Sequence, residues 1–163
     1  MAEAAPSSPA KASKTETRQT AKCYEDFRLG DFTYRIQGPV ATGLIGHGPA
    51  GAEATPKAIF IVICYLVTNE AKKTKTVLAD DFLLLDSEGR EFSPSAKALT
   101  ALLLSEPNQD FIVRELQPGI TRQAMTAFEV PYSSYSKGLT LIVPEKGLFG
   151  YKQCEVSFAS ERR

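Results

Sequence analysis

The feature that most constrains the fold is an apolar run from Ala58 to Val67, closed by the polar pair Thr68-Asn69. The run is rich in β-branched and aromatic residues, and Pro56 precedes it. It is far shorter than the roughly 20 residues that a membrane-spanning helix requires, and its composition favours a β-strand. We therefore predict a central strand here, with the later strands of the chain lying beside it.

This strand has apolar side chains on both faces. Alternate residues from Ile59 to Val67 share one face, and those from Phe60 to Leu66 share the other. A strand of a β-sandwich normally needs only one apolar face, because the other face meets water. We therefore expect the second face to be covered by the glycine-rich segment 38–56 or by another copy of the chain.

Length and charge narrow the class of protein. A chain of 163 residues with 43% hydrophobic residues is long enough for one domain with a substantial core. Its 19 basic and 19 acidic residues cancel, so no global field would gather nucleic acid or an anionic membrane. Nucleic acid is therefore not an expected partner, and no segment has the length and apolarity of a transmembrane helix.

The N-terminal segment differs from the rest of the chain. Residues 1–22 contain no Leu, Ile, Val, Phe or Tyr, so they cannot bury enough apolar surface to offset the entropy of ordering them. The segment also lacks the apolar stretch of a signal peptide. We predict a disordered tail or tether over 1–25 and one domain over 26–159.

The middle of the chain alternates between strand and turn signals. We expect one or two strands from Asp26 to Ile36, ended by Gly38-Pro39, and then a long loop over 38–56. The clearest hairpin has its turn between Asp86 and Gly89, where Gly89 is available for positive φ.

The rest of the chain predicts one helix and more strands. Helical spacing of leucines indicates a short amphipathic helix over about 95–105, which we expect to cap one end of the sheets. Further strands are expected over 111–116, 120–130, 139–143 and 151–158, with a polar loop at 131–137. Seven to nine short strands with one helix predict an all-β, immunoglobulin-like antiparallel sandwich.

Four motifs add a family resemblance. They are Val67-Thr68-Asn69, the stretch from Asp81 to Asp86 followed by Gly89, Leu116-Gln117-Pro118-Gly119, and Ala127-Phe128-Glu129-Val130-Pro131. In this order they resemble a bacterial domain of unknown function in the telokin-like, immunoprotective extracellular antigen superfamily.

The resemblance covers residues 26–158 and implies structural roles. Asn69 would close the central strand, Gly89 would close the hairpin, Pro118-Gly119 would form a turn at a sheet edge, Phe128 would anchor the core, and Pro131 would stop a strand. Phe82 and Asp86 are further structural motif residues of the resemblance. The family further implies an exported protein, often a lipoprotein, with no established activity. Because this chain carries no signal or lipobox as written, a cytoplasmic location also stays open.

The sequence contains none of the motifs of common catalytic, nucleotide-binding or metal sites in the structural context that they require. The only histidine, His47, lies in a glycine-rich loop without a G-x-S-x-G, H-E-x-x-H or P-loop string. Gly46–Gly51 matches G-x-G-x-x-G, but neither a strand before it nor a helix after it is expected. Three widely spaced cysteines and one histidine cannot complete a zinc site of the usual spacing. We expect no catalytic residues, no metal and no cofactor.

A binding module for a protein or another component of the cell envelope is the favoured function. The candidate contact residues lie in the two longest predicted loops and are Leu44, Ile45, His47, Tyr132 and Tyr135. The same side chains could instead fold back as lids over the ends of the sandwich. An architectural domain that associates with its own copies is the alternative function, and a hydrolase with an unrecognised site is a third.

Overall fold

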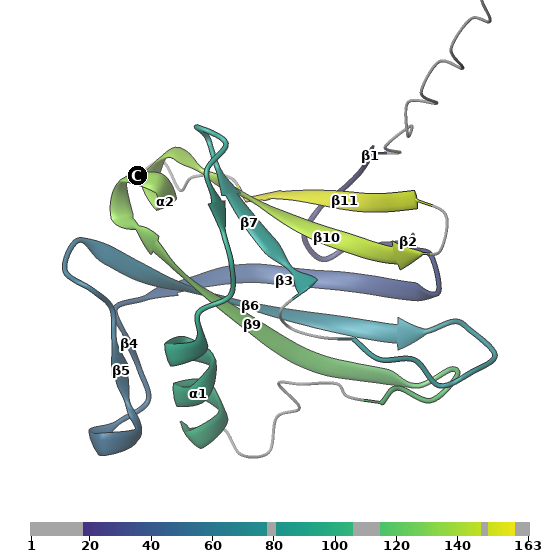
Figure 1. Ribbon diagram of the computed structural model, residues 1–163, viewed down its shortest axis with the longest axis horizontal. Helices are drawn as coiled ribbons and strands as arrows, with labels where there is room; N and C mark the ends of the chain where they lie inside the picture. The colour runs from purple at the N-terminus through teal and green to yellow at the C-terminus, as the bar shows by residue number, and fades with distance from the viewer. Residues whose placement is uncertain (1–17, 78–80, 106–114, 148–149, 159–163) are drawn as a thin grey trace, which may run out of the picture.

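The computed structural model describes residues 18–77, 81–105, 115–147 and 150–158, and two packed β-sheets dominate it (Figure 1). The five-stranded sheet has the order β1 (Arg18–Ala21), β11 (Gly150–Phe158), β10 (Leu139–Gly147), β7 (Leu83–Asp86) and β8 (Glu91–Phe92). The four-stranded sheet has the order β2 (Asp26–Leu29), β3 (Phe32–Thr42), β6 (Ala58–Asn69) and β9 (Thr121–Pro131). The predicted antiparallel β-sandwich is therefore confirmed, although β1 runs parallel to β11.

The apolar run forms β6, which is an interior strand of the four-stranded sheet. It pairs with β3 on one side and with β9 along almost its whole length on the other. Ile61, Ile63, Tyr65 and Val67 on its inner face are buried between the two sheets, with exposures of 1% or less. The prediction of a central strand is thus confirmed.

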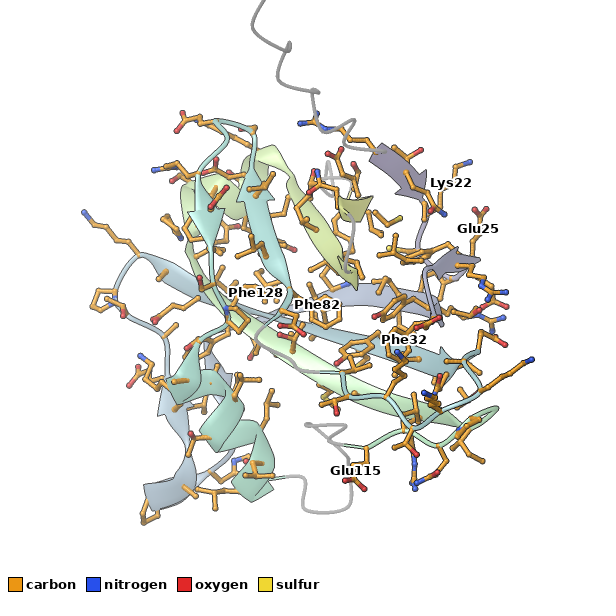
Figure 2. The ribbon with its side chains drawn as sticks, turned by 45° about the vertical axis from the view of Figure 1, so that its right-hand side comes forward. Lys22, Glu25, Phe32, Phe82, Glu115 and Phe128 are labelled. Atoms are coloured by element: carbon orange, nitrogen blue, oxygen red, sulfur yellow. The ribbon has the colours of Figure 1, made fainter. Side chains whose placement is uncertain are left out.

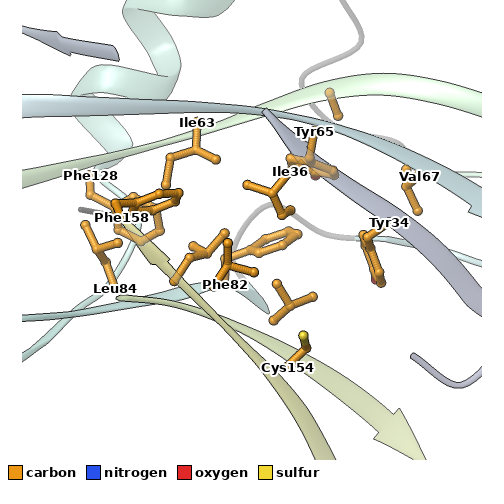
Figure 3. Close-up of a cluster of buried hydrophobic side chains, with 14 of the residues drawn as sticks. Tyr34, Ile36, Ile63, Tyr65, Val67, Phe82, Leu84, Phe128, Cys154 and Phe158 are labelled. Atoms are coloured by element: carbon orange, nitrogen blue, oxygen red, sulfur yellow. The ribbon is translucent and has the colours of Figure 1, made fainter. Parts of the chain in front are cut away.

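Aromatic rings fill the space between the sheets (Figure 3). The ring of Phe82 lies 4.8 Å from that of Tyr65 and 6.4 Å from that of Tyr34, which it meets edge-on. Phe128 of β9 and Cys154 of β11 are fully buried in the same core. Figure 2 shows Phe82 and Phe128 in the interior of the molecule, as the sequence motifs predicted for Phe128.

The outer face of β6 has a second core. In Figure 1, helix α1 (Ala96–Ser105) and the small hairpin of β4 (Leu44–Ile45) and β5 (Ala52–Glu53) lie on the side of the four-stranded sheet that faces away from β10 and β11. This layer buries Phe60 and Val62. The expectation that segment 38–56 covers the second face is confirmed.

Helix α1 occupies a different place from the one we expected. It does not cap an end of the sheets, because Ala98, Ala101 and Leu102 pack into this second core. Lys97 of the helix donates to the Glu53 carbonyl at 2.9 Å and lies over the Phe60 ring, 5.3 Å from its centroid. The helix therefore completes the covering layer with the β4–β5 hairpin.

Two predictions near the N-terminus are wrong. Residues 18–21 do not belong to a disordered tail, since they form β1, the edge strand that pairs with β11. Gly38-Pro39 does not end the strand, because β3 continues to Thr42 through a bulge between Ile36 and Pro39. β2 pairs with β3 only up to Arg35, so the later part of β3 is a sheet edge, where a proline without an N–H is tolerated.

Two further segments differ from the sequence-based expectation. The predicted polar loop at 131–137 contains the helix α2 (Tyr132–Lys137). Segment 38–56 contains β4, β5 and the short 3-10 helix η1 (Gly48–Ala50). The predicted strand over 111–116 lies mostly outside the described residues, but Leu116 forms an isolated antiparallel bridge with Lys75. In the part of the chain that is described, no helix is long and apolar enough to cross a membrane.

Candidate functional site

The two candidate tyrosines lie together on α2. The rings of Tyr132 and Tyr135 are 6.0 Å apart, with Tyr132 57% exposed and Tyr135 half-buried against the inner core. The helix begins at Tyr132, whose N–H donates to the Lys57 carbonyl. It ends at Lys137 and is followed by Gly138, whose φ of 101° is strained for any other residue. Pro131 ends β9 immediately before the helix, in line with its predicted role as a strand stop.

The other three candidates lie on a different side of the molecule. Ile45 is 5% exposed and belongs to the outer core, whereas Leu44 is 55% exposed and His47 is also exposed. The four-stranded sheet separates them from the core in which Tyr135 packs. The structure therefore does not unite the two predicted loops into one site. Ile45 is a core residue and not a contact residue, but it covers the outer face of the four-stranded sheet and not an end of the sandwich.

A groove of about 490 Å³ lies beside α2, between the two sheets. Its main walls come from the connection between β1 and β2, from the bulge of β3, from α2 and from the end of β11. The residues concerned are Cys23, Tyr24, Gly38, Pro39, Tyr135 and Phe158. Of the five predicted binding residues only Tyr135 lines this groove, and the sequence analysis proposes a binding role for none of the other lining residues.

Tyr24 is held in an unusual backbone conformation at the mouth of the groove. Its φ is 67°, a region that L-residues other than Gly, Asn and Asp rarely adopt, and its side chain is 68% exposed. The Tyr24 N–H donates to the Ile36 carbonyl at 2.8 Å, which fixes this conformation against β3. Strained residues of this kind concentrate at functional sites.

Gly38 makes room for the Tyr24 ring. A Cβ at position 38 would lie 3.0 Å from the Tyr24 hydroxyl oxygen, so a side chain there would push the ring away. The only sequence signal for this contact was the Gly38-Pro39 dipeptide, which was interpreted as the end of a strand. Figure 2 labels Lys22 and Glu25, the residues that flank Cys23-Tyr24, at the side of the molecule where β1 leads into β2.

The electrostatics of the groove suit binding rather than nucleophilic chemistry. Burial raises the pKa of the Cys23 thiol, and a hydrogen bond with backbone only partly offsets this effect. The thiol therefore stays protonated at neutral pH, whereas a nucleophilic cysteine needs a lowered pKa. Among the described residues, no group of three or more His, Cys, Asp or Glu side chains could hold a metal ion.

A buried carboxylate fixes α2 to the β7–β8 turn. The Asp86 side chain accepts hydrogen bonds from the backbone N–H groups of Glu88 and Arg90, from the Arg90 Nε at 2.7 Å and from the Ser134 hydroxyl at 3.0 Å. Burial alone would raise the pKa of Asp86, but these donors outweigh it and lower the pKa to about 2. The motif residue Asp86 thus helps to position the helix that carries the two tyrosines.

Asn69 organises the opposite end of the sandwich. Its side chain is fully buried, donates to the carbonyls of Lys73 and Leu116 and accepts from the Ala71 N–H. Its backbone carbonyl accepts from the Gly119 N–H, and Gly119 has a φ of 75°. Asn69 therefore closes β6, as the motif implied. It also joins this strand to the Pro118-Gly119 turn, a contact that the sequence did not predict.

A smaller cavity of about 120 Å³ lies near this end. Tyr34 and Phe82 line it, and the Lys75–Asp31 ion pair, at 3.1 Å, stands beside them. The hydroxyl of Tyr65, whose ring touches both aromatic residues, has no hydrogen-bond partner among the described residues.

Comparisons with known proteins find similar folds but no related sequence family. No protein-family model and no curated protein matches the sequence. An uncharacterized β-sandwich protein from Clostridium difficile is similar to this chain, with a TM-score of 0.58 and 11% identity over 93% of this chain and 100% of that one.

Two other similar structures belong to proteins that are described as secreted or as a candidate lipoprotein. One is a secreted protein from Mycobacterium tuberculosis, with a TM-score of 0.57 and 12% identity over 85% of this chain and 96% of that one. The other is a candidate lipoprotein from Bacillus subtilis, with a TM-score of 0.61 and 10% identity over 85% of this chain and 39% of that one. The chain thus shares its β-sandwich fold with uncharacterized bacterial proteins, and its structural neighbours include a secreted protein and a candidate lipoprotein.

Proposed function

We propose that this protein is a non-enzymatic interaction module of the cell envelope or the extracellular space, and that it belongs to the telokin-like superfamily. The secreted protein and the candidate lipoprotein among its structural neighbours support the location. The order of the four sequence motifs supports the superfamily.

The observation that carries the binding role is the groove beside α2. Two tyrosines line it, and a third, Tyr132, is exposed next to it. Tyrosine is favoured in contact surfaces, because it offers a large rigid ring with few rotatable bonds and a hydroxyl. Holding Tyr24 at positive φ costs free energy of folding, and a partner that uses its ring would account for that cost.

The test compares two double variants of the full chain as bait. Tyr24→Asn with Tyr132→Ala removes the exposed rings of the groove side, and asparagine tolerates the positive φ. Leu103→Ala with Leu104→Ala is the matched control, because both leucines are exposed and neither lines the groove. Wild-type protein and the leucine variant should retain the same envelope or secreted partner, and the tyrosine variant should lose it.

The dissociation constant of each variant for the purified partner is then measured and compared with that of the wild type. Loss of two contact tyrosines should weaken binding by about tenfold or more, since each such truncation costs about 1 kcal/mol or more at a hot spot. Equal affinity of both variants would contradict the proposal. A stable dimer of the wild-type chain that the tyrosine variant does not form would instead favour the architectural, self-associating function.

A further inference from the structure

The shape and chemistry of the groove suggest what it binds. Its walls combine the aromatic rings of Tyr24, Tyr135 and Phe158 with the ring of Pro39 and the bare backbone of Gly38. Among the described residues that line it, only Lys22 is formally charged. Grooves of this aromatic and weakly charged type bind proline-containing extended peptides, whose rings pack on aromatic faces.

An extended proline-containing segment has a physical advantage as a ligand. The polyproline II conformation has three residues per turn, so prolines at i and i+3 project on the same side. Because proline already restricts φ, such a segment loses little conformational entropy when it binds.

The chain itself contains such a segment. The sequence Pro6-Ser7-Ser8-Pro9 is a P-x-x-P string flanked by alanines, and it precedes the first described residue, Arg18. Its small neighbours would not obstruct a shallow groove. The prolines of residues 18–77, 81–105, 115–147 and 150–158 belong to strands, turns, the 3-10 helix or, for Pro94, the connection between β8 and α1.

The geometry of β1 brings this segment within reach. Arg18 pairs with Gln153 at the start of the parallel β1–β11 ladder, and Phe158, which lines the groove, lies five positions further along β11. At the rise of a β-strand this is about 17 Å. The nine residues from Pro9 to Arg18 can span up to about 30 Å when extended, so the connecting length is sufficient for the string to reach the groove of its own chain.

We propose that the groove beside α2 binds the chain's own P-x-x-P string, and that this intramolecular contact competes with an external partner for the same tyrosines. The competition rests on the proposed function, because the bound string can exclude only a partner that uses the same groove. Its own test does not require that partner.

Cys23 provides a built-in probe of occupancy. Its thiol is half-buried and lines the groove, whereas Cys64 is also half-buried but packs on the outer core. Burial raises the pKa of both thiols. The rates at which the two thiols of the full chain react with a small alkylating reagent, measured by peptide mass spectrometry, therefore report on the groove and on a matched reference site.

The variant Pro6→Ala with Pro9→Ala should open the groove. A short tether gives an effective concentration of about 1 mM, so a string whose free-peptide Kd is about 0.2 mM would occupy about five-sixths of the grooves and slow Cys23 labelling about sixfold. We expect that slowing to vanish in the proline variant, with the Cys64 rate unchanged. Ser7→Ala with Ser8→Ala, which keeps both prolines, should label like the wild type.

A synthetic peptide of residues 3–13 completes the test. It should bind the proline variant more tightly than the wild type, and Tyr24→Asn should abolish this binding. Unchanged Cys23 labelling together with no peptide binding to the proline variant would overturn the inference. So would occupancy that depends on protein concentration, because the occupant would then be the string of another copy.

The two proposals can fail separately. Loss of partner capture in the tyrosine variant without any effect of the prolines would keep the proposed function and remove the intramolecular contact. Occupancy by the string with no partner for the groove would do the reverse.

Discussion

The Ser134 hydroxyl of α2 donates a 3.0 Å hydrogen bond to the buried carboxylate of Asp86 in the β7–β8 turn. The same hydroxyl accepts from the Arg90 guanidinium at 2.9 Å, so one serine links both members of the Asp86–Arg90 ion pair to the helix. This small network joins the hairpin of the five-stranded sheet to the segment that follows β9 of the other sheet. It explains why the two tyrosines of α2 have a fixed position beside the groove.

The first prediction concerns the pH dependence of stability. The pKa of Asp86 is about 2 in the folded protein and lies near 3.9 in an unfolded chain, so the unfolded state binds more protons between these values. The stabilisation from Asp86 is therefore complete above about pH 4 and is lost as the pH falls through about 2. In Asp86→Asn, Tm should be lower than wild type at pH 7, and the difference should shrink towards pH 2.

Thermal melts of both proteins across this range check the prediction. Other carboxylates contribute to acid unfolding of both proteins alike, so the difference between the two curves isolates Asp86. A difference in Tm that stays constant from pH 7 to pH 2 would show that the carboxylate is not ionised through this network.

The second prediction concerns Gly89. Its φ of 78° lies in the left-handed region, and a Cβ there would meet no other atom, so any cost of substitution comes from the backbone alone. Gly89→Val should lower the free energy of unfolding by about 1–2 kcal/mol, the cost of this region for an L-residue. Urea titration measures the difference.

Gly43→Ala is the control for that experiment. Gly43 also has open space around its Cβ position but does not have a positive φ. The alanine variant should be neutral or stabilised by up to about 1 kcal/mol, because alanine restricts the unfolded chain. Equal losses in the two variants would contradict the assignment of the Gly89 cost to its φ.

The third prediction concerns Asn69. Replacing it with alanine would remove the side-chain partner of the Lys73 carbonyl and of the Ala71 N–H, and one of the two donors to the Leu116 carbonyl, at the buried end of β6. We expect a loss of about 2–3 kcal/mol in the free energy of unfolding. Gln117→Ala, which removes only the exposed hydrogen bond between Thr74 and Gln117, should cost less than about 0.5 kcal/mol. Similar costs for the two would refute the role given to Asn69.

The fourth prediction separates two neighbouring residues that the sequence could not distinguish. Ile45 is buried in the outer core, and Ile45→Ala should cost about 2–4 kcal/mol. Leu44 is 55% exposed, and Leu44→Ala should change the free energy of unfolding by less than about 0.5 kcal/mol. A small cost at Ile45 would mean that the β4–β5 hairpin does not cover β6.

The sequence by itself determined the features that depend on neighbouring residues. The continuous apolar run predicted that β6 has apolar side chains on both faces, and both faces are covered in the structure. Gly89 and Gly119 were predicted at turns and both have positive φ. Such features follow from periodicity and backbone sterics, which are local.

Only the tertiary structure decided which distant segments meet. The sequence around Arg18 carries no apolar pattern, and it becomes a strand because β11 offers an edge with unpaired backbone groups. Pro39 is tolerated within β3 because the bulge lies where β2 has already ended. Tyr24 and Tyr135 line one groove because the β1–β2 connection and α2 lie at the same side of the sandwich. These contacts depend on sheet order and strand register, which no local pattern encodes.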